Sequence, residues 1–349
     1  MHGLMEHPSD NPVGVALFGV GRMGQVHVKH LVEHLLADIV YLVDAPGEKD
    51  RVQRLIWTYH LMGKTQYASI EDADRVMADD RVKAVFVCTP TEHHELLIEK
   101  ALHAGKHVFT EKPVTFSVDK ARQFYQEASA RGIILFCAFN RRHDPGVKKI
   151  KKSVSNGEVG NLLMIKICNR DPPSVCSGAY LAKSGDIFHD STVHGFDMVS
   201  FLTNEMPQSL VAFGHAHEAF YTEIDDVDSA AVMLKFPSGL MAILENSRKS
   251  AYGYDQRLEV AGTKGVLILE NPVPYQVQSR TLDGTTEEPT HVDIVKRYHE
   301  SYKAEVGHFL EGVVGLRTCE DPDGSGAILA LRLADLSTQS LKSGQVMTV

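Results

Sequence analysis

The sequence is short of cysteines and of long apolar segments. It has 5 cysteines in 349 residues, scattered and never spaced C-x-x-C. This set is typical of reduced thiols in a cytosolic protein, and it argues against a disulfide framework or a thiolate zinc site. No apolar run approaches the roughly 20 residues that span a bilayer. Because the first residues, MHGLMEHPSDN, lack a basic segment followed by an apolar one, we expect a cytoplasmic protein without a signal peptide.

Positive charge is also in short supply. The chain has 36 Lys and Arg residues against 45 Asp and Glu residues, a net charge of −9, which opposes binding to nucleic acid or to an anionic membrane. Its 43% of apolar and 23% of charged residues exclude a disordered chain, a collagen and a coiled coil. At roughly 150 residues per domain, the length predicts about two domains.

The first half of the sequence alternates apolar strands with helices. The predicted strands are 13–20, 39–44, 83–90, 107–113 and 133–140. Helical stretches run over 23–36 and 92–104, and another begins at Ser117. This alternation predicts an α/β domain over 13–140, with a parallel sheet covered by helices on both faces. We expect the polar leader 1–12 to be disordered.

The second half is mainly strands in succession. They are predicted at 162–169, 209–217, 229–236, 240–246, 257–262 and 265–270, with one helix over 186–202. This pattern favours an α+β domain over 141–349 with a large, open, mostly antiparallel sheet. Helical stretches at 294–314 and 325–342 close the chain, and their packing, including a return of the last helix to the first domain, is left open.

A dinucleotide motif follows the first strand. Gly19-Val20-Gly21-Arg22-Met23-Gly24 matches G-x-G-x-x-G, and Asp44 ends the next strand 20 residues beyond Gly24. The glycines let the backbone approach a pyrophosphate, and the carboxylate accepts hydrogen bonds from the ribose hydroxyls. An acidic residue there repels a 2′-phosphate and favours NAD over NADP. A nearby arginine, Arg22, can instead favour binding of the phosphate of NADP.

Two further groups carry possible chemistry. Glu111-Lys112-Pro113 follows a strand end, where α/β sheets bind ligands, although a surface lysine on a turn, with a cis or trans X-Pro bond, is an equal alternative. Asp190 and His194 are four residues apart on the predicted helix, so the carboxylate could orient the imidazole as a general base. A surface ion pair, or a metal site that includes Asp197, are the alternatives. The vicinal His93-His94 is expected to be a solvated helix start.

Four motifs together resemble one family. They are G-x-G-x-x-G, C-T-P-T-x-H (88–93), E-K-P (111–113) and D-x-x-x-H-x-x-D (190–197). They resemble the glucose–fructose oxidoreductase/inositol dehydrogenase/rhizopine-catabolism (Gfo/Idh/MocA) oxidoreductase family. Longer stretches are similar to its myo-inositol 2-dehydrogenase branch, namely FNRRHDP (139–145), NRDPP (169–173), SGDIFHDSTVHGFD (184–197) and NSRKSAYGYDQRLEVAGTKG (246–265).

The resemblance implies a reaction and a catalytic set. The expected reaction is the NAD-dependent oxidation of a secondary hydroxyl of a cyclic polyol, myo-inositol to the 2-keto compound. By the family's pattern, His194 takes the hydroxyl proton, Asp190 orients His194, and Lys112 hydrogen-bonds the hydroxyl oxygen. Hydride passes to C4 of the nicotinamide.

The resemblance also implies binding residues and an assembly. The residues that it implies for cofactor binding are Gly19, Gly21, Arg22, Met23, Gly24, Asp44, Thr89, Pro90, His93, Glu111 and Lys112. The polyol pocket falls to Asn140, Arg141, Asn169, Asp171 and one of Tyr252 and Tyr254, for which packing in the sheet is the alternative. No metal is implied, and a homo-oligomer, a dimer or tetramer through the second domain's sheet, is expected.

Some positions depart from the branch. Gly185-Asp186 stands where the branch often has two glycines, Gly195 where it often has an acidic residue, and Asn140 where some relatives carry Met. These departures bear on the substrate more than on the reaction type. An NAD(P)-dependent dehydrogenase of an aldose or another polyol, and a non-catalytic NAD-binding sensor, remain the alternatives. A metal-dependent hydrolase would leave the dinucleotide motif unexplained.

Overall fold

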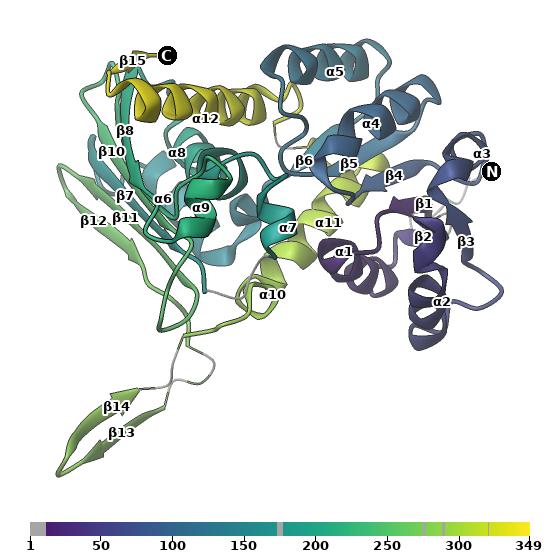
Figure 1. The fold of residues 1–349 in the computed structure, drawn as a ribbon, viewed down its shortest axis with the longest axis horizontal. Coiled ribbons are helices and arrows are strands. Elements are labelled where there is room, and N and C mark those ends of the chain that lie inside the picture. Colours follow the sequence, from purple (N-terminus) through teal and green to yellow (C-terminus); the bar gives the residue numbers. More distant parts are fainter. Residues whose placement is uncertain (1–11, 173–176, 274, 276, 288–289, 320) are drawn as a thin grey trace, which may run out of the picture. The chain divides into compact units, whose positions relative to one another are not determined.

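The computed structural model describes residues 12–172, 177–273, 275, 277–287, 290–319 and 321–349. The chain divides into two compact units, Met1–Asn140 with Glu300–Ile328, and Arg141–His299 with Leu329–Val349. Their helices and strands are labelled in Figure 1. Residues 1–11 of the expected leader, and Cys176, lie outside the described residues. The predicted domains meet at a single boundary after residue 140, whereas the segment 300–328 belongs to the first unit.

The first unit is built on a six-stranded parallel sheet in the order β3-β2-β1-β4-β5-β6. Its strands are β1 (Val13–Phe18), β2 (Ala37–Asp44), β3 (Gln66–Ser69), β4 (Ala84–Val87), β5 (His107–Glu111) and β6 (Leu135–Ala138). This is the Rossmann arrangement, and it confirms the α/β prediction. The sequence analysis did not identify β3, because its four residues are QYAS and only Ala68 among them is buried.

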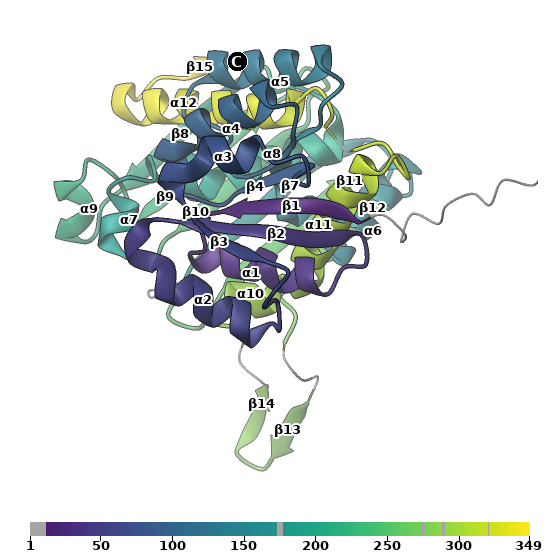
Figure 2. The same cartoon turned by 90° about the vertical axis from the view of Figure 1, so that its right-hand side faces the viewer.

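Helices cover both faces of this sheet. On one side lie α1 (Arg22–Val32) and α2 (Lys49–Thr58), and on the other lie α3 (Ala73–Met77), α4 (His94–His103) and α5 (Val118–Ala130), as Figure 2 shows. The core that α1 and α2 bury also receives α11 (His299–Val313). The ring centroid of Phe309 lies 5.4 Å from that of Phe86 and 5.6 Å from that of Phe109. Much of the predicted helical stretch 294–314 therefore packs in the first unit.

The second unit contains a seven-stranded sheet in the order β12-β11-β7-β10-β9-β8-β15. Its strands are β7 (Leu162–Arg170), β8 (Ser209–His215), β9 (Ser229–Lys235), β10 (Met241–Ser247), β11 (Asp255–Gly262), β12 (Gly265–Leu269) and β15 (Met347–Thr348). Strands β7 and β10 pair in parallel, and the other neighbouring pairs are antiparallel. The prediction of a large, mostly antiparallel sheet is confirmed.

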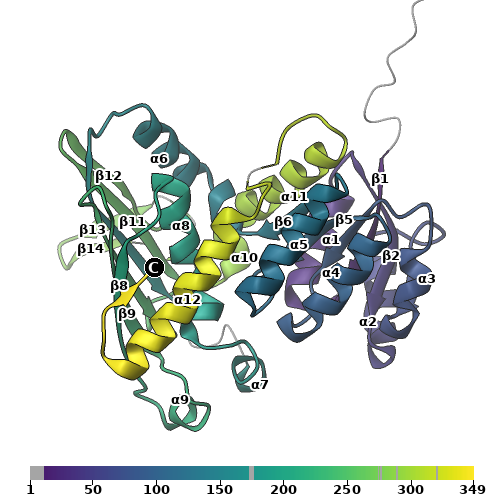
Figure 3. The same cartoon turned by 90° about the horizontal axis from the view of Figure 1, so that it is seen from above.

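One face of this sheet is covered and the other is exposed. Side chains alternate between buried and exposed along β9 and β10, and α6 (Pro145–Ser155) and α8 (Val193–Thr203) lie on the buried side (Figure 3). A hairpin of β13 (Gln278–Thr281) and β14 (Gly284–Glu287) stands away from the sheet (Figure 1). Among the described residues, no helix has the length and the apolar character needed to cross a membrane.

Candidate active site

The glycine motif forms a tight turn between β1 and α1. Gly19 has a φ of +88°, and a Cβ there would lie 2.7 Å from backbone atoms of Cys88 and Thr89. A Cβ on Gly24 would lie 1.9 Å from the Gly19 carbonyl oxygen, so glycine is what lets α1 pack this closely. A Cβ on Gly21 would meet nothing within 4 Å. The turn therefore leaves backbone open at the N-terminus of α1, as a bound pyrophosphate requires.

Asp44 ends β2 beside this turn. Its Oδ2 accepts hydrogen bonds from the Val20 N–H and the Arg51 guanidinium, each at 2.8 Å, and its Oδ1 accepts one from the Ala45 N–H at 2.8 Å. A carboxylate has about four lone-pair sites, so acceptor capacity remains for a ribose hydroxyl. Arg51, which no sequence motif singles out, contacts Asp44, and Arg22 begins α1 and is exposed.

The residues after β4 and β5 are tied together by His94. Its Nδ1 lies 2.9 Å from the Pro113 carbonyl oxygen and its Nε2 lies 2.9 Å from the Thr89 carbonyl oxygen. Burial lowers the pKa of His94. The expectation that His93 and His94 both form a solvated helix start is therefore wrong for His94, which is 1% exposed. His93 is exposed and lies 3.7 Å from Glu92.

A histidine on α1, His27, contacts the first residue of the Glu-Lys-Pro turn. Glu111 Oε1 lies 2.7 Å from Nε2 of His27 on α1. Burial alone would raise the pKa of Glu111, but the His27 hydrogen bond and charge lower it overall. The Lys112–Pro113 bond is cis, and Lys112 is partly buried. Thr89 adds a buried Oγ1 without a hydrogen-bond partner among the described residues, as expected of a group that meets a ligand.

The residues of the first unit therefore fit a dinucleotide. The open backbone at Gly21, the Asp44 carboxylate and the Thr89 hydroxyl follow β1, β2 and β4 at the carboxyl ends of the parallel strands. The strand order reverses between β1 and β4, and such a switch point is where Rossmann sheets bind their ligand.

The helix that carries Asp190 and His194 begins as a π-helix. The sequence analysis treated 186–202 as one α-helix, but Phe188–Thr192 form the π-helical turn η6, and α8 begins at Val193. Within a π-helical turn the hydrogen bonds join residues five apart, so side chains four apart still lie near one face of the helix. Short π-helical segments inside helices occur frequently at functional sites.

Asp190 is buried in an ionic network. Its Oδ2 lies 2.9 Å from the Arg248 guanidinium, and its Oδ1 accepts a hydrogen bond from the Tyr180 hydroxyl at 2.9 Å. Arg248 also contacts Oδ2 of Asp226 at 3.2 Å. Burial alone would lower the pKa of Arg248, but the charges of Asp190 and Asp226 raise it well above its usual value. The Asp190 carboxyl group therefore lies between a guanidinium and a tyrosine hydroxyl, both of which donate hydrogen bonds to it.

Asp197 has a structural partner. It is 1% exposed, and both of its oxygens lie 3.0 Å from Nε of Arg142 in a buried ion pair. The alternative of a metal site made with His194 is therefore wrong for Asp197. Within the described ranges, no three His, Cys, Asp or Glu residues are placed to share a metal ion.

Several residues predicted for the polyol pocket lie together in the second unit. Arg141 donates to Oδ1 of Asn169 at 2.5 Å and is hydrogen-bonded to Tyr254. The Ser191 hydroxyl lies 3.4 Å from Oδ2 of Asp171. Among the predicted pocket residues, Asn140 belongs instead to the first unit, where its Nδ2 lies 3.4 Å from the Ser301 hydroxyl.

The two tyrosines predicted as alternatives for the pocket, Tyr252 and Tyr254, differ in burial and in their partners. Tyr254 is 2% exposed and packs its ring 6.0 Å from that of Tyr298. Tyr252 is 51% exposed and donates to Oδ2 of Asp255 at 2.6 Å, while Arg170 donates to it at 2.8 Å. Of the two, Tyr254 is the one that lies with Arg141.

The structure shows what surrounds two of the positions, Gly195 and Asp186, at which the sequence departs from the myo-inositol 2-dehydrogenase branch. A Cβ on Gly195 would lie 2.7 Å from Cδ2 of Leu244, so a side chain at this helix position would require the buried Leu244 side chain to shift. Asp186 accepts hydrogen bonds from the backbone N–H groups of Phe188 and His189, each at 3.0 Å, at the start of η6. A glycine could not supply this carboxylate.

Comparisons with known proteins decide the family. Residues 13–139 match the model of an oxidoreductase family with an NAD-binding Rossmann fold, and residues 147–268 match the GFO/IDH/MocA C-terminal domain. The chain belongs to the Gfo/Idh/MocA family. It is 34% identical to the inositol 2-dehydrogenase of Rhizobium meliloti, over 97% of this chain and 99% of that protein. It is 31% identical to the scyllo-inositol 2-dehydrogenase (NAD⁺) of Bacillus subtilis, over 97% and 96% of the two chains.

The solved structures agree. A myo-inositol dehydrogenase from Corynebacterium glutamicum superposes with a TM-score of 0.87 at 30% identity, over 97% of this chain and 99% of that one. As a Gfo/Idh/MocA protein, the chain is an oxidoreductase whose first unit is an NAD-binding Rossmann domain.

Sequence reasoning missed Arg51, His94 and Arg248. Their partners lie 7, 5 and 58 positions away in the sequence, respectively. None of these separations belongs to a motif that was recognised in the sequence. For His94 one signal existed, because it opens the helix between β4 and β5, where its side chain can reach the ends of both strands.

Proposed function

We propose that this Gfo/Idh/MocA protein oxidises a secondary hydroxyl of a cyclic polyol with NAD, with myo-inositol to 2-keto-myo-inositol as the favoured reaction. The similarity to inositol 2-dehydrogenases along nearly the whole chain carries the proposal. A polyol needs many hydrogen-bonding groups rather than a strong charge. The group of Arg141, Asn169, Asp171 and Tyr254 in the second unit offers donors and acceptors of that kind.

Three side chains perform the proton chemistry in this proposal. His194 accepts the proton of the reacting hydroxyl, and Asp190, which contacts the Arg248 guanidinium, stabilises the imidazolium that forms. Lys112 donates a hydrogen bond to the hydroxyl oxygen and stabilises its developing negative charge. When bound, NAD supplies the acceptor for the hydride at its nicotinamide C4.

The remaining predicted residues bind and orient. The glycine turn with Arg22 and Met23 receives the pyrophosphate, Asp44 receives the ribose, and Thr89, Pro90, His93 and Glu111 line the rest of the cofactor site. For the polyol, Asn140, Arg141, Asn169 and Asp171 are joined by Tyr254, whose contact with Arg141 favours it over Tyr252.

The test is NAD reduction at alkaline pH across a panel of inositols, aldoses and simple alcohols, repeated with NADP. We expect turnover with myo-inositol and NAD, and a His194→Ala variant that is slower by about 10²–10⁴-fold. The matched control is His103→Ala, at an exposed histidine 3.5 Å from Glu127. Tight NAD binding without turnover of any polyol would instead favour the sensor alternative, and activity confined to aldoses would favour the other dehydrogenase alternative.

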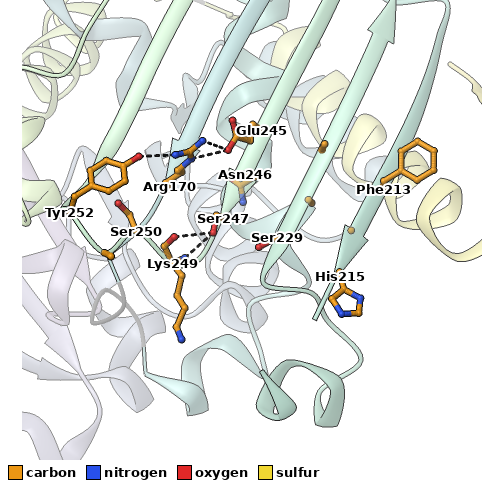
Figure 4. Close-up of a pocket in the computed structure, with 14 residues that line it drawn as sticks. Arg170, Phe213, His215, Ser229, Glu245, Asn246, Ser247, Lys249, Ser250 and Tyr252 are labelled. Atoms are coloured by element: carbon orange, nitrogen blue, oxygen red, sulfur yellow. Dashed lines mark hydrogen bonds and ion pairs between the residues drawn. The ribbon is translucent and has the colours of Figure 1, made fainter. Parts of the chain in front are cut away.

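We also propose that the protein is a cytoplasmic homo-oligomer, a dimer or tetramer assembled through the exposed face of the second sheet. Large apolar side chains lie exposed on that face, namely Phe213, Met233, Met241, Val266 and Ile268. A pocket of about 650 Å³ lies on the same face, lined in part by Arg170, Phe213 and Tyr252 (Figure 4). Sedimentation that shows a monomer at micromolar concentration would contradict this assembly.

A further inference from the structure

Asp186 organises the beginning of the π-helical turn η6. Its Oδ1 accepts the backbone N–H groups of Phe188 and His189, and it lies 2.7 Å from Nδ1 of His189. Its Oδ2 accepts the hydroxyl of Thr338 on α12 (Ser325–Ser343). One carboxylate thus joins the start of η6 to a distant helix.

His189 completes a second link to α12. Its Nε2 lies 3.0 Å from Oδ1 of Asp335, so both ring nitrogens face carboxylates. A neutral imidazole has one N–H, and only the imidazolium can donate to both. Burial alone would lower the pKa of His189, but the hydrogen bonds with Asp186 and Asp335 raise it to about 9. The charge is held in a site where the side chain is 12% exposed.

The groups that bear on this charge come from several elements. Asp186 and Asp335 touch the ring from the preceding loop and from α12. Asp226 and Lys342 act through their charge interactions with Asp186. On η6 itself the neighbour is Asp190, whose charge is matched by Arg248.

The contacts of His189 lie next to Asp190, the residue proposed to stabilise the catalytic imidazolium. His189 precedes Asp190 in the same turn, and Asp190 is bound from another direction by Arg248, which follows β10. π-helical turns are rare, and side-chain contacts border this one on two sides. The contacts of Asp186 and His189 hold the side of η6 that faces α12, while Arg248 holds Asp190 itself.

We propose that His189, held as an imidazolium between Asp186 and Asp335, is a positioning residue that keeps the π-helical turn in the geometry that places Asp190 for the reaction. The inference rests on the proposed dehydrogenase function. His189 binds neither substrate nor cofactor in this role, so its loss should lower kcat and leave KM nearly unchanged. A displacement of about 1 Å in a catalytic group can cost about 100-fold in rate.

The experiment measures kcat and KM for myo-inositol from pH 6 to 10.5 in the wild type and in three variants. His189→Gln keeps a polar side chain without the charge and is expected to lower kcat by about 10- to 100-fold, with KM within about twofold. His189→Arg keeps the charge at every pH, so kcat should persist above pH 9, where the wild type declines. In Asp335→Asn the alkaline decline should move to lower pH.

Two measurements do not depend on turnover. An NMR titration should place the His189 imidazole near pH 9 in the wild type and lower in Asp335→Asn. Amide hydrogen exchange over 188–194 should be faster in His189→Gln than in the control His217→Gln, which removes an exposed imidazole from another buried carboxylate, Asp228. If the wild type oxidises no polyol, the proposed function fails while exchange still tests the link.

The inference is overturned if His189→Gln keeps wild-type kcat and exchange. It is also overturned if the alkaline decline of His189→Arg and Asp335→Asn coincides with that of the wild type, because the charge would then have no part in positioning. The inference is likewise overturned if a variant loses thermal stability but keeps the wild-type kcat and its pH profile.

Discussion

Arg248 is the buried cation on which the proposed catalytic turn most depends. The residue is 6% exposed, and its guanidinium contacts Asp190 at 2.9 Å and Asp226 at 3.2 Å. Arg248→Met keeps an apolar stem of similar length and removes the charge. Asp190 would retain the Tyr180 hydroxyl and Asp226 the backbone N–H of Ile187, and both carboxylates would lose the Arg248 guanidinium.

The expected loss of stability is large. Removing one partner of a buried ion pair destabilises a protein by about 3–5 kcal/mol, because the remaining charge stays buried without compensation. For a unit of this size each kcal/mol lowers the melting temperature by about 2–4 °C, so we expect a decrease of about 6–20 °C. The matched control is Arg122→Met, in an exposed pair with Asp119, for which we expect less than about 1 kcal/mol.

The pH dependence sharpens this prediction. Burial already raises the pKa of Asp226 even with Arg248 present. Without the cation both carboxyl groups bind protons more readily in the folded state, and protonation relieves the buried charge. The difference in unfolding free energy between the wild type and Arg248→Met should therefore be larger at pH 8 than at pH 5.

Calorimetry and urea denaturation at both pH values provide the assay. The reasoning is refuted if Arg248→Met loses no more stability than Arg122→Met. A loss of equal size at pH 5 and pH 8 would show that packing, rather than the uncompensated carboxylates, sets the cost.

Three further predictions test other parts of the structure. Asp44→Ala should weaken NAD binding by about 10- to 100-fold in calorimetric titration, because charge-assisted hydrogen bonds to the ribose are lost; unchanged affinity would mean that the ribose binds elsewhere. Phe309→Ala should lower the unfolding free energy by about 3–5 kcal/mol in urea, and a loss below 1 kcal/mol would contradict the packing of α11 in the first core. His189, with a pKa raised from 6.5 to about 9, should contribute up to about 3 kcal/mol that is fully present below pH 6.5 and is lost as the pH rises through 9; a difference between wild type and His189→Gln that stays constant from pH 6 to 10 would contradict it.

Local patterns were enough to predict most of the framework. The glycine spacing, the apolar strands and Asp44 follow one another within 45 residues, and the chemistry of each depends on near neighbours in the chain. The strands of the second sheet could be recognised in the same way, because side chains alternate between its two faces. The return of α11 to the first core could not, since its apolar face fits either unit equally well as a pattern.

The proposed catalytic turn shows the opposite case. Spacing identified Asp190 and His194 as a pair, yet it assumed an α-helix where the chain forms a π-helical turn. That turn is held by Asp186, His189 and Arg248, and each of the three has a partner more than 50 positions away. No periodicity in 186–202 records such contacts.

The sequence by itself determined the two-domain plan, the dinucleotide turn and the resemblance to polyol dehydrogenases, because these depend on short-range spacing and on side-chain type. Only the tertiary structure decided which cation meets Asp44, that His94 is buried, that Asp197 pairs with Arg142, and that His189 is clamped between two carboxylates. The physical reason is the same in each case. The ionisation and orientation of a buried polar group depend on what lies within about 3 Å of it, and folding brings those atoms together from distant parts of the chain.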